Sequence, residues 1–175
     1  QREQCGVPAD SILGIGVGLS GFFINEHGKM NTHSKLNAWA DINIAEVISQ
    51  HFQLPTWVTN DASTAAAGEG IAGIGRRYKN FVYFYISSAF GGGLISNNDM
   101  LTGTFGNAGE LGDMIPPKFY VHPNLELLRQ IWSKNGVEID SVYDIIDHYQ
   151  DNWTGIDEWI FKVKDALSLV ATCSS

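Results

Sequence analysis

The chain has 175 residues, of which 44% are hydrophobic and 17% are charged, and its formal net charge is −8 at pH 7. This composition excludes a disordered or fibrous chain and is typical of a folded domain with a sizeable core. The acidic balance argues against nucleic-acid binding by this chain alone, because phosphate backbones require clustered Lys and Arg. The only tight basic cluster runs from Arg76 to Lys79, and we interpret it as a solvated loop.

The first predicted elements are short. SILGIGV (11–17) indicates an apolar strand whose glycines continue into GLSG (18–21), where a ligand or another backbone can approach closely. A hairpin is predicted from strands at 22–24 and 29–31, because turn-forming residues fill the gap between them. A helix beginning at Asp41 would then carry one apolar stripe, formed by Ile44, Ile48 and Phe52.

The run TNDASTAAAGEG (59–70) joins a predicted strand at 54–59 to an Ala-rich helix. Asn60 and Asp61 lie at the joint. Ligands of α/β proteins collect at the carboxyl ends of strands, and a carboxylate there can accept a proton from a bound hydroxyl. Asn and Asp are also preferred helix N-caps, so the pair predicts a cap, a ligand site or both.

A second unit is predicted from about residue 80. FVYFYIS (81–87) indicates a strand, Gly91 to Gly93 a bend, and the following LIS a second strand. A second Gly-rich loop, TGTFGNAGELG, spans 102–112. After it, three helical segments are predicted. The first follows an Asn124 cap and carries Leu125, Leu128 and Trp132 on one face. The second follows a capping box of Ser141 and Asp144, and the third lies near the C-terminus; their apolar residues are Ile145, Ile146 and Tyr149, then Ile156, Ile160 and Val163.

The two cysteines, Cys5 and Cys173, form no CxxC pair, so neither a disulfide framework nor a zinc site is expected. No apolar run reaches the length of about 18 residues that a membrane span needs, and the first ten residues lack a signal-peptide pattern. The sequence therefore predicts a cytoplasmic protein without a membrane partner. The opening strand and the last helix lack partner strands in the sequence, so we expect an internal fragment of a longer protein.

Three segments in this order resemble the ROK family of sugar kinases and sugar-responsive transcriptional repressors: GIGVGLSG (14–21), TNDASTAAAGEG (59–70) and SSAFGGGLISNNDMLTGTFGNAGELGD (87–113). The resemblance implies an α/β chain with the actin-like, ribonuclease H-like ATPase fold, incomplete here and with a helical C-terminal part. Residues 1–79 would be the remainder of an N-terminal lobe, and residues 80–175 the start of a C-terminal lobe.

The resemblance also implies a sugar site. Asp61 matches the catalytic base of the kinases, and Asn60 beside it would hydrogen-bond sugar hydroxyls. Glu110 matches a second sugar ligand, and Asp113 stands where the family has a histidine that touches the sugar. The family's G-x-P-G loop passes close to the sugar. Its two glycines match Gly18 and Gly21 of this chain, and Ser20 replaces its proline.

The nucleotide site that the resemblance implies is altered. The second phosphate loop, which meets ATP in the kinases, falls on Ser88 and on Gly91, Gly92 and Gly93. Ser87 and Ala89 replace glycines of that loop and add Cβ atoms where the backbone would approach the phosphates. A β-bulge or tight bend is the alternative role of the three glycines. The first phosphate loop and the cysteine-rich zinc segment of the family are absent from this sequence, so we expect no zinc.

These departures favour the sugar-binding, effector-sensing domain of a ROK-type transcriptional regulator, with a sugar or sugar phosphate as its ligand. DNA would be bound only through an N-terminal winged helix outside this sequence. Family members often form homo-oligomers, and an interface or the core is the expected place of Trp132, Trp153 and Trp159. The alternative is a fragment of an ATP-dependent sugar kinase, glucokinase-like or N-acetylhexosamine kinase-like, with ATP and Mg²⁺ as cofactors and Asp61 as base.

A third hypothesis treats residues 125–149 as a helix-turn-helix that reads DNA. Its second helix would carry Asp140, Asp144 and Asp147 and no Lys or Arg. These carboxylates would repel a phosphate backbone, which argues against the hypothesis.

Overall fold

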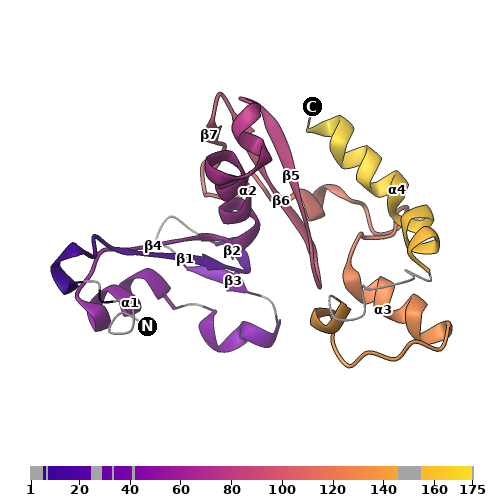
Figure 1. Cartoon of the computed structure of the whole chain (residues 1–175), viewed down its shortest axis with the longest axis horizontal. Helices are drawn as coiled ribbons and strands as arrows, with labels where there is room; N and C mark the ends of the chain where they lie inside the picture. Colours follow the sequence, from indigo (N-terminus) through magenta and orange to yellow (C-terminus); the bar gives the residue numbers. More distant parts are fainter. Residues whose placement is uncertain are drawn as a thin grey trace.

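The computed structural model describes residues 6, 8–24, 29–32, 34–40, 42–145 and 155–174. The described part of the chain mixes helices and strands, as the predicted α/β class requires. In Figure 1 helix α2 stands between the strands of the N-terminal part and the long β5–β6 ribbon, and α3 and α4 lie beyond that ribbon. Among the described residues, no helix combines the length and apolar character that crossing a membrane requires.

Strands β1 (Ile15–Leu19) and β4 (Thr56–Asn60) pair in parallel, and their last residues, Leu19 and Asn60, lie side by side. The strand predicted at 11–17 therefore begins later, at Ile15. Its start is set by β4, because the Ile15 N–H donates to the Pro55 carbonyl at 2.8 Å. The carboxyl ends of both strands point toward the same edge, where the chain turns into the next elements.

Strands β2 (Gly21–Phe23) and β3 (Met30–Thr32) form the predicted antiparallel hairpin. Its register pairs Phe22 with Asn31 and Phe23 with Met30. Met30 is 1% exposed and forms the core of this part of the chain together with Leu19 and Ile44. The predicted turn at 25–28 lies outside the described residues.

Helix α1 (Ile44–Phe52) begins after the predicted position, because Asn43 is its N-cap and accepts a hydrogen bond from the Glu46 N–H at 3.1 Å. Asp41 lies outside the described residues. Ile44 and Ile48 face the core as predicted. Phe52 is 58% exposed, so the predicted apolar stripe is wrong at its last position.

Strands β5 (Phe81–Ile86), β6 (Phe90–Ser96) and β7 (Asp99–Met100) form an antiparallel sheet. Gly91, Gly92 and Gly93 are not a bend: they lie inside β6, and the turn before them is Ser87–Ala89, closed by a 2.8 Å hydrogen bond from the Ser87 N–H to the Ala89 carbonyl. The glycines are explained by close packing. A Cβ at Gly93 would overlap Ala66 of helix α2 (Asp61–Ala72), and a Cβ at Gly92 would overlap Leu111.

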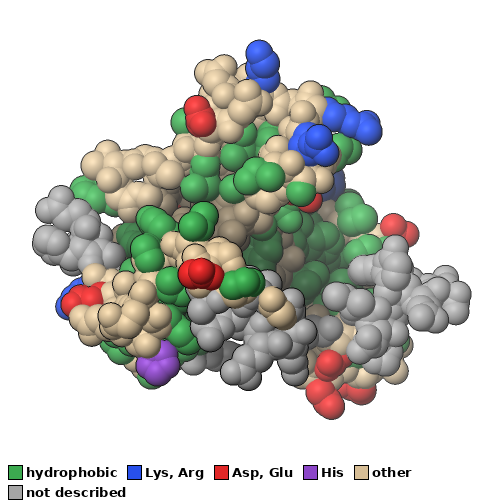
Figure 2. Space-filling view, turned by 60° about the vertical axis from the view of Figure 1, so that its left-hand side comes forward, with side chains coloured by type: hydrophobic (Ala, Val, Ile, Leu, Met, Phe, Trp, Pro, Cys, Tyr) green, Lys and Arg blue, Asp and Glu red, His purple; other side chains and the backbone are tan. Residues whose placement is uncertain are grey.

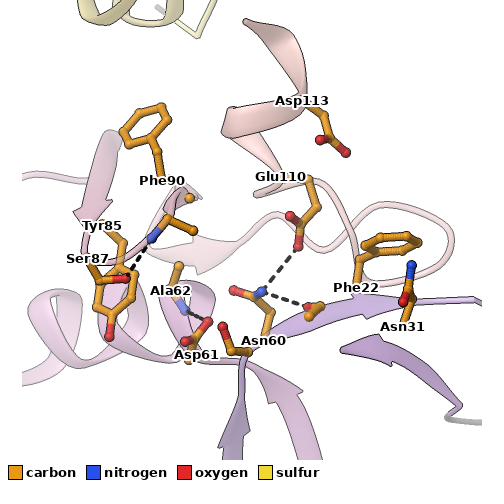
Figure 3. A pocket seen from close by; sticks show the side chains of 14 residues that line it. Phe22, Asn31, Asn60, Asp61, Ala62, Tyr85, Ser87, Phe90, Glu110 and Asp113 are labelled. Atoms are coloured by element: carbon orange, nitrogen blue, oxygen red, sulfur yellow. Dashed lines mark hydrogen bonds between the residues drawn. The ribbon is translucent and has the colours of Figure 1, made fainter. Parts of the chain in front are cut away.

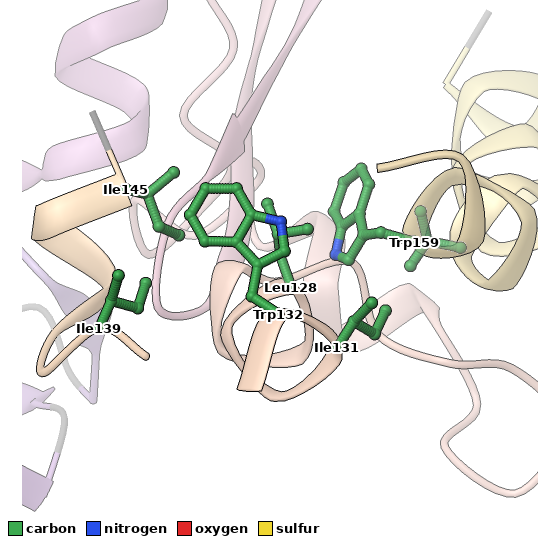
Figure 4. Close-up of a cluster of buried hydrophobic side chains, with 7 residues drawn as sticks. Leu128, Ile131, Trp132, Ile139, Ile145 and Trp159 are labelled. Carbon is green, nitrogen blue, oxygen red and sulfur yellow. The ribbon is translucent and has the colours of Figure 1, made fainter. Parts of the chain in front are cut away.

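The β5–β6 ribbon is covered on its other side by helix α4 (Ile156–Cys173), through a cluster of Phe90, Leu111, Ile115, Ala166 and Val170. A second cluster joins α4 to helix α3 (Leu125–Lys134); Figure 4 shows its members Leu128, Ile131, Trp132, Ile139, Ile145 and Trp159. Trp132 and Trp159 are thus core residues, whereas Trp153 lies outside the described part. Ile160 is 49% exposed, so the predicted stripe is wrong there; Trp159, Val163, Ala166 and Val170 form it instead.

The predicted Asn124 cap is confirmed, since Asn124 Oδ1 accepts from the Leu127 N–H at 2.8 Å. The capping contact from the Ser141 N–H to Asp144 Oδ2 is also present at 2.9 Å, but it opens a single 3-10 turn at Val142–Ile145. Ile139 and Ile145 are buried against α3. The described part of this segment, residues 125–145, therefore packs into the core. It does not present a second helix to DNA, as the helix-turn-helix hypothesis would require.

Candidate functional site

A pocket of about 390 Å³ opens where five loop and strand ends meet (Figure 3). The contributing segments are the β1–β2 turn with the start of β2, β3, the β4–α2 junction, the β5–β6 turn with the adjoining ends of both strands, and the 3-10 helix Leu111–Met114 with its preceding residue. The pocket is within the size range of small-molecule sites, roughly 300–1,000 Å³. It is lined by Ser20, Gly21, Phe22, Asn31, Asn60, Asp61, Ala62, Tyr85, Ser87, Ala89, Phe90, Gly91, Glu110 and Asp113.

Asn60 is the last residue of β4 and the N-cap of α2, and its side chain hydrogen-bonds to α2, the start of β2 and Glu110. Its Oδ1 accepts from the Ser63 N–H at 3.0 Å, which makes Asn60 the N-cap of α2. Its Nδ2 donates to the Gly21 carbonyl at 2.9 Å and to Glu110 Oε1 at 3.2 Å. Because the side chain is 8% exposed, these hydrogen bonds form away from water and fix the pocket floor.

Asp61 is the first residue of α2, not its cap. One carboxylate oxygen, Oδ1, accepts from the Ala62 N–H at 2.9 Å. The other oxygen has no hydrogen-bond partner among the described residues, and the side chain lines the pocket. The sequence predicts that Asn60 or Asp61 could cap this helix. The structure shows that Asn60 is the cap, whereas the Asp61 carboxylate lies at the cavity.

Glu110 and Asp113 approach from the opposite wall, as Figure 3 shows. Leu111, which follows Glu110, is 1% exposed and anchors this wall in the core. Burial, and after it the charges of Asp113 and Asp61, together raise the pKa of Glu110 to about 7. Near neutral pH the Glu110 carboxyl therefore exchanges a proton readily, and it can both accept and donate hydrogen bonds.

The loop that carries Glu110 is fastened to the hairpin by Asn107. Its Oδ1 accepts from the Phe23 N–H at 2.8 Å, and its Nδ2 donates to the Phe23 carbonyl at 2.7 Å. The Asn107 carbonyl in turn accepts from the Glu110 N–H at 3.2 Å. The side-chain amide thus pairs with β2 as a neighbouring strand would, and this link between residues 84 positions apart joins two walls of the pocket.

The structure brings together six of the ten residues assigned in the sequence to a sugar or nucleotide site: Gly21, Asn60, Asp61, Gly91, Glu110 and Asp113 line the pocket. Gly18 does not line it; a Cβ there would lie 3.2 Å from Thr64 Oγ1, so this glycine lets α2 approach β1. Ser88, Gly92 and Gly93, predicted for a nucleotide phosphate, are also not among the lining residues. For the two glycines, close packing of α2 and Leu111 on β6 is the physical reason.

Sequence reasoning missed Phe22 and Asn31 as pocket residues. The signal was available, because a hairpin with a four-residue turn at 25–28 pairs residue 22 with residue 31 and places them on one face. It also missed Asn107, for which no sequence signal stands out within the Gly-rich loop. Tyr85 points to the pocket from the end of β5, a position that only the relative placement of the two sheets determines.

Charge at the pocket is one-sided. Among the described residues that line it there are three carboxylates and no Lys, Arg or His. In Figure 2 most Lys and Arg side chains of the face shown lie toward its top and upper right, and the hollowed centre is lined largely by hydrophobic side chains. Within the described part of the chain, no group of three His, Cys, Asp or Glu side chains is arranged to hold a metal ion.

Comparison with known proteins connects this geometry to one family. The ROK family profile matches residues 4–126. The chain is 33% identical to a xylose repressor of Bacillus spizizenii over 103 residues, which cover 59% of this chain and 26% of the repressor. It is 35% identical to a glucokinase of Halalkalibacterium halodurans over 101 residues, 58% of this chain and 30% of the glucokinase. The chain thus spans less than a third of either relative.

Solved structures show the same fold. A glucokinase from Parabacteroides distasonis superimposes with a TM-score of 0.66 and covers 98% of this chain and 56% of the glucokinase, at 17% sequence identity. The fold is therefore the α/β, actin-like fold of the ROK sugar kinases, of which this chain forms a part.

Proposed function

The chain belongs to the ROK family, and we propose that its pocket recognises an uncharged sugar as the effector of a ROK-type transcriptional regulator. The observation that carries the proposal is the convergence of Asn60, Asp61 and Glu110 on one cavity. Both classes of relative, xylose repressors and glucokinases, are named for a monosaccharide.

The donor and acceptor groups of the pocket suit a ring of hydroxyls. Each sugar hydroxyl both donates and accepts, and a carboxylate oxygen accepts strongly from it. The Asp61 oxygen without a partner among the described residues is such an acceptor, and the Glu110 and Asp113 carboxyls offer others across the cavity. Asn60 positions these acceptors, since it already hydrogen-bonds Glu110.

The charge of the pocket favours the free sugar over a sugar phosphate. A phosphate group would bring about −1.5 to −2 charges toward three carboxylates with no described cation in the lining. Like charges at such separations repel in a partly desolvated site. Of the two ligand classes expected from the sequence, the unphosphorylated sugar is therefore preferred.

The turn where the family resemblance places nucleotide phosphates supports recognition rather than phosphoryl transfer. The Ser87 N–H is used within the turn, by the Ala89 carbonyl, and the Ser87 carbonyl accepts from the Leu125 N–H at 2.8 Å. Ser87 and Ala89, which add Cβ atoms to this turn, line the pocket. Cradling phosphates needs backbone N–H groups that are free to turn toward them.

The test is a thermal-shift screen of the full-length protein with D-xylose and D-glucose, paired with an assay for sugar phosphate in the presence of Mg–ATP. We expect one of the sugars to raise the melting temperature, because a ligand that binds only the folded state stabilises it by mass action. We expect no sugar phosphate to form. Product formation at a steady rate would overturn the regulator assignment.

A kinase is the second candidate, favoured by the position of Asp61 at the N-terminus of α2, where its second carboxylate oxygen, unpaired among the described residues, lies at the cavity. In a kinase, Asp61→Asn should lower kcat by orders of magnitude and change KM little, because the base acts in the transition state. In an effector site the same variant should weaken sugar binding, with no turnover to lose.

A further inference from the structure

The β2–β3 hairpin presents two different faces, and one of them belongs to the pocket. Phe23 and Met30 pair on the face toward the core, where Met30 is 1% exposed. Phe22 and Asn31 pair on the opposite face and line the pocket. Side chains alternate along a strand, so this division follows from the register alone.

The pocket face of the hairpin combines one aromatic ring with one amide. The Phe22 side chain is 39% exposed, although it stands beside buried core residues. Asn31 is also exposed, and no described residue is recorded as a hydrogen-bond partner of its side chain. Figure 3 shows the two side chains next to each other on the hairpin, with Glu110 and Asp113 on the neighbouring wall.

We propose that the pair Phe22 and Asn31 determines which sugar the pocket accepts, with the Phe22 ring against the apolar C–H face of a pyranose and Asn31 hydrogen-bonded to one hydroxyl. The inference rests on the proposed sugar-binding function and adds residues that the family motifs of this sequence do not contain. A pyranose exposes C–H groups on its faces and hydroxyls at its rim. A ring beside an amide complements both, and burial of the C–H face removes apolar area from water.

The position of the pair is fixed from both ends of β2. Asn60 Nδ2 binds the Gly21 carbonyl on one side of Phe22. Asn107 binds both backbone groups of Phe23 on the other side. The backbone of Phe22 is therefore held relative to Asp61 and Glu110, and a held side chain can discriminate between sugars better than a mobile one.

The test uses calorimetric titration of the full-length protein with D-glucose, D-xylose and a series of monodeoxy-D-glucoses. Phe22→Leu keeps an apolar side chain but removes the flat ring, and we expect about tenfold weaker binding of the preferred sugar. Phe22→Tyr keeps the ring and should bind within about threefold of wild type. Phe119→Ala is the control, because Phe119 is 73% exposed and does not line the pocket.

Asn31 is tested by a thermodynamic cycle. In the wild-type protein one deoxy sugar should bind about tenfold more weakly than glucose because it lacks the hydroxyl that Asn31 contacts. In Asn31→Ala that difference should disappear for this deoxy sugar and persist for the others, since only the paired groups are coupled. Circular dichroism spectra and melting curves of each variant establish that it is folded.

The two proposals fail in different ways. If the wild-type protein binds neither glucose nor xylose, both are overturned. If it binds one of them and the Phe22 and Asn31 variants leave every affinity and every deoxy-sugar difference unchanged, the specificity assignment is wrong while the sugar site stands.

Discussion

At the scale of single residues, Asn60 is the pocket residue whose side chain hydrogen-bonds to three different segments. It caps α2, holds the β1–β2 turn and contacts Glu110 through one amide. The sequence could predict that Asn60 or Asp61 caps the helix, because both residue types do so. It could not say which one, because the choice depends on the Gly21 carbonyl and Glu110, which come from distant segments.

Asn60→Ala should lower the free energy of unfolding by about 2–4 kcal/mol, since it removes a cap and leaves buried hydrogen-bond groups of the neighbouring segments unpaired. Asn43→Ala is the matched control: Asn43 also caps a helix, but it does not line the pocket. It should cost about 1 kcal/mol and leave sugar affinity unchanged. Urea denaturation measures both, and equal losses in the two variants would contradict the role given to Asn60.

Glu110 predicts a pH dependence. Its folded pKa of about 7 lies above its ordinary value of 4.5, so the folded state holds one proton more than the unfolded state between these values. The free energy of unfolding should therefore fall as pH rises from about 4.5 to 7 and level off above it. Glu110→Gln should remove this contribution.

The control for that titration is Glu158→Gln, because Glu158 is 51% exposed and lies far from the pocket in sequence, in an ion pair with Lys162 at 3.5 Å. It should leave the slope between pH 4.5 and 7 as in the wild type. Denaturation curves at several pH values decide the matter. A Glu110→Gln variant with the wild-type slope would show that the folded protein does not raise the pKa of this carboxyl.

At the scale of elements, the sequence predicts most helices and strands because apolar periodicity and capping residues are local. It misplaces the start of β1 and the glycines of β6 because those depend on partners. β1 begins where β4 pairs with it, and the three glycines look like a bend until α2 and Leu111 are packed against them. The capping contact at Ser141 likewise opens a 3-10 turn at Val142–Ile145, where the described residues stop.

The packing role of the glycines predicts different results for neighbouring substitutions. Gly93→Ala should destabilise the protein by about 1–3 kcal/mol, because the new Cβ would overlap Ala66 and force α2 away from β6. Gly91→Ala is the matched control, since its Cβ would meet Ala62 at 3.4 Å, close to ordinary contact. Thermal unfolding of both compares them. Equal stabilities would contradict the packing account and restore another role for Gly93.

At the scale of the whole molecule, the pocket exists because α2 connects two sheets. The helix begins at the carboxyl end of β4 and packs on β6, so Asp61 at its first turn faces the loop of Glu110. The expected division into residues 1–79 and 80–175 stays a prediction; α2 lies on the first side of it and contacts strands on the second. Homo-oligomer formation also stays a prediction, and Trp132 and Trp159 lie in the core of the chain.

The family and the fold could be predicted from three short motifs, because their residues follow strand ends whose placement the family shares. The wall formed by Phe22 and Asn31 and the Asn107 link could not be predicted from those motifs, because they depend on how the hairpin and the Glu110 loop meet. Similarity to relatives does not distinguish a regulator from a kinase, because a xylose repressor and a glucokinase match this chain at similar identity. The distinction depends on whether the chain's own site transfers a phosphoryl group.

The most direct test of the account is calorimetric titration of the full-length protein and its Asp61→Asn and Glu110→Gln variants with D-glucose, D-xylose and D-glucose 6-phosphate, in the absence of nucleotide. We predict that one free sugar binds the wild-type protein, that each substitution weakens its binding about tenfold or more through loss of a carboxyl group that hydrogen-bonds the sugar, and that the phosphate does not bind. Unchanged affinity in both variants, or tighter binding of the phosphate than of either free sugar, would contradict the account.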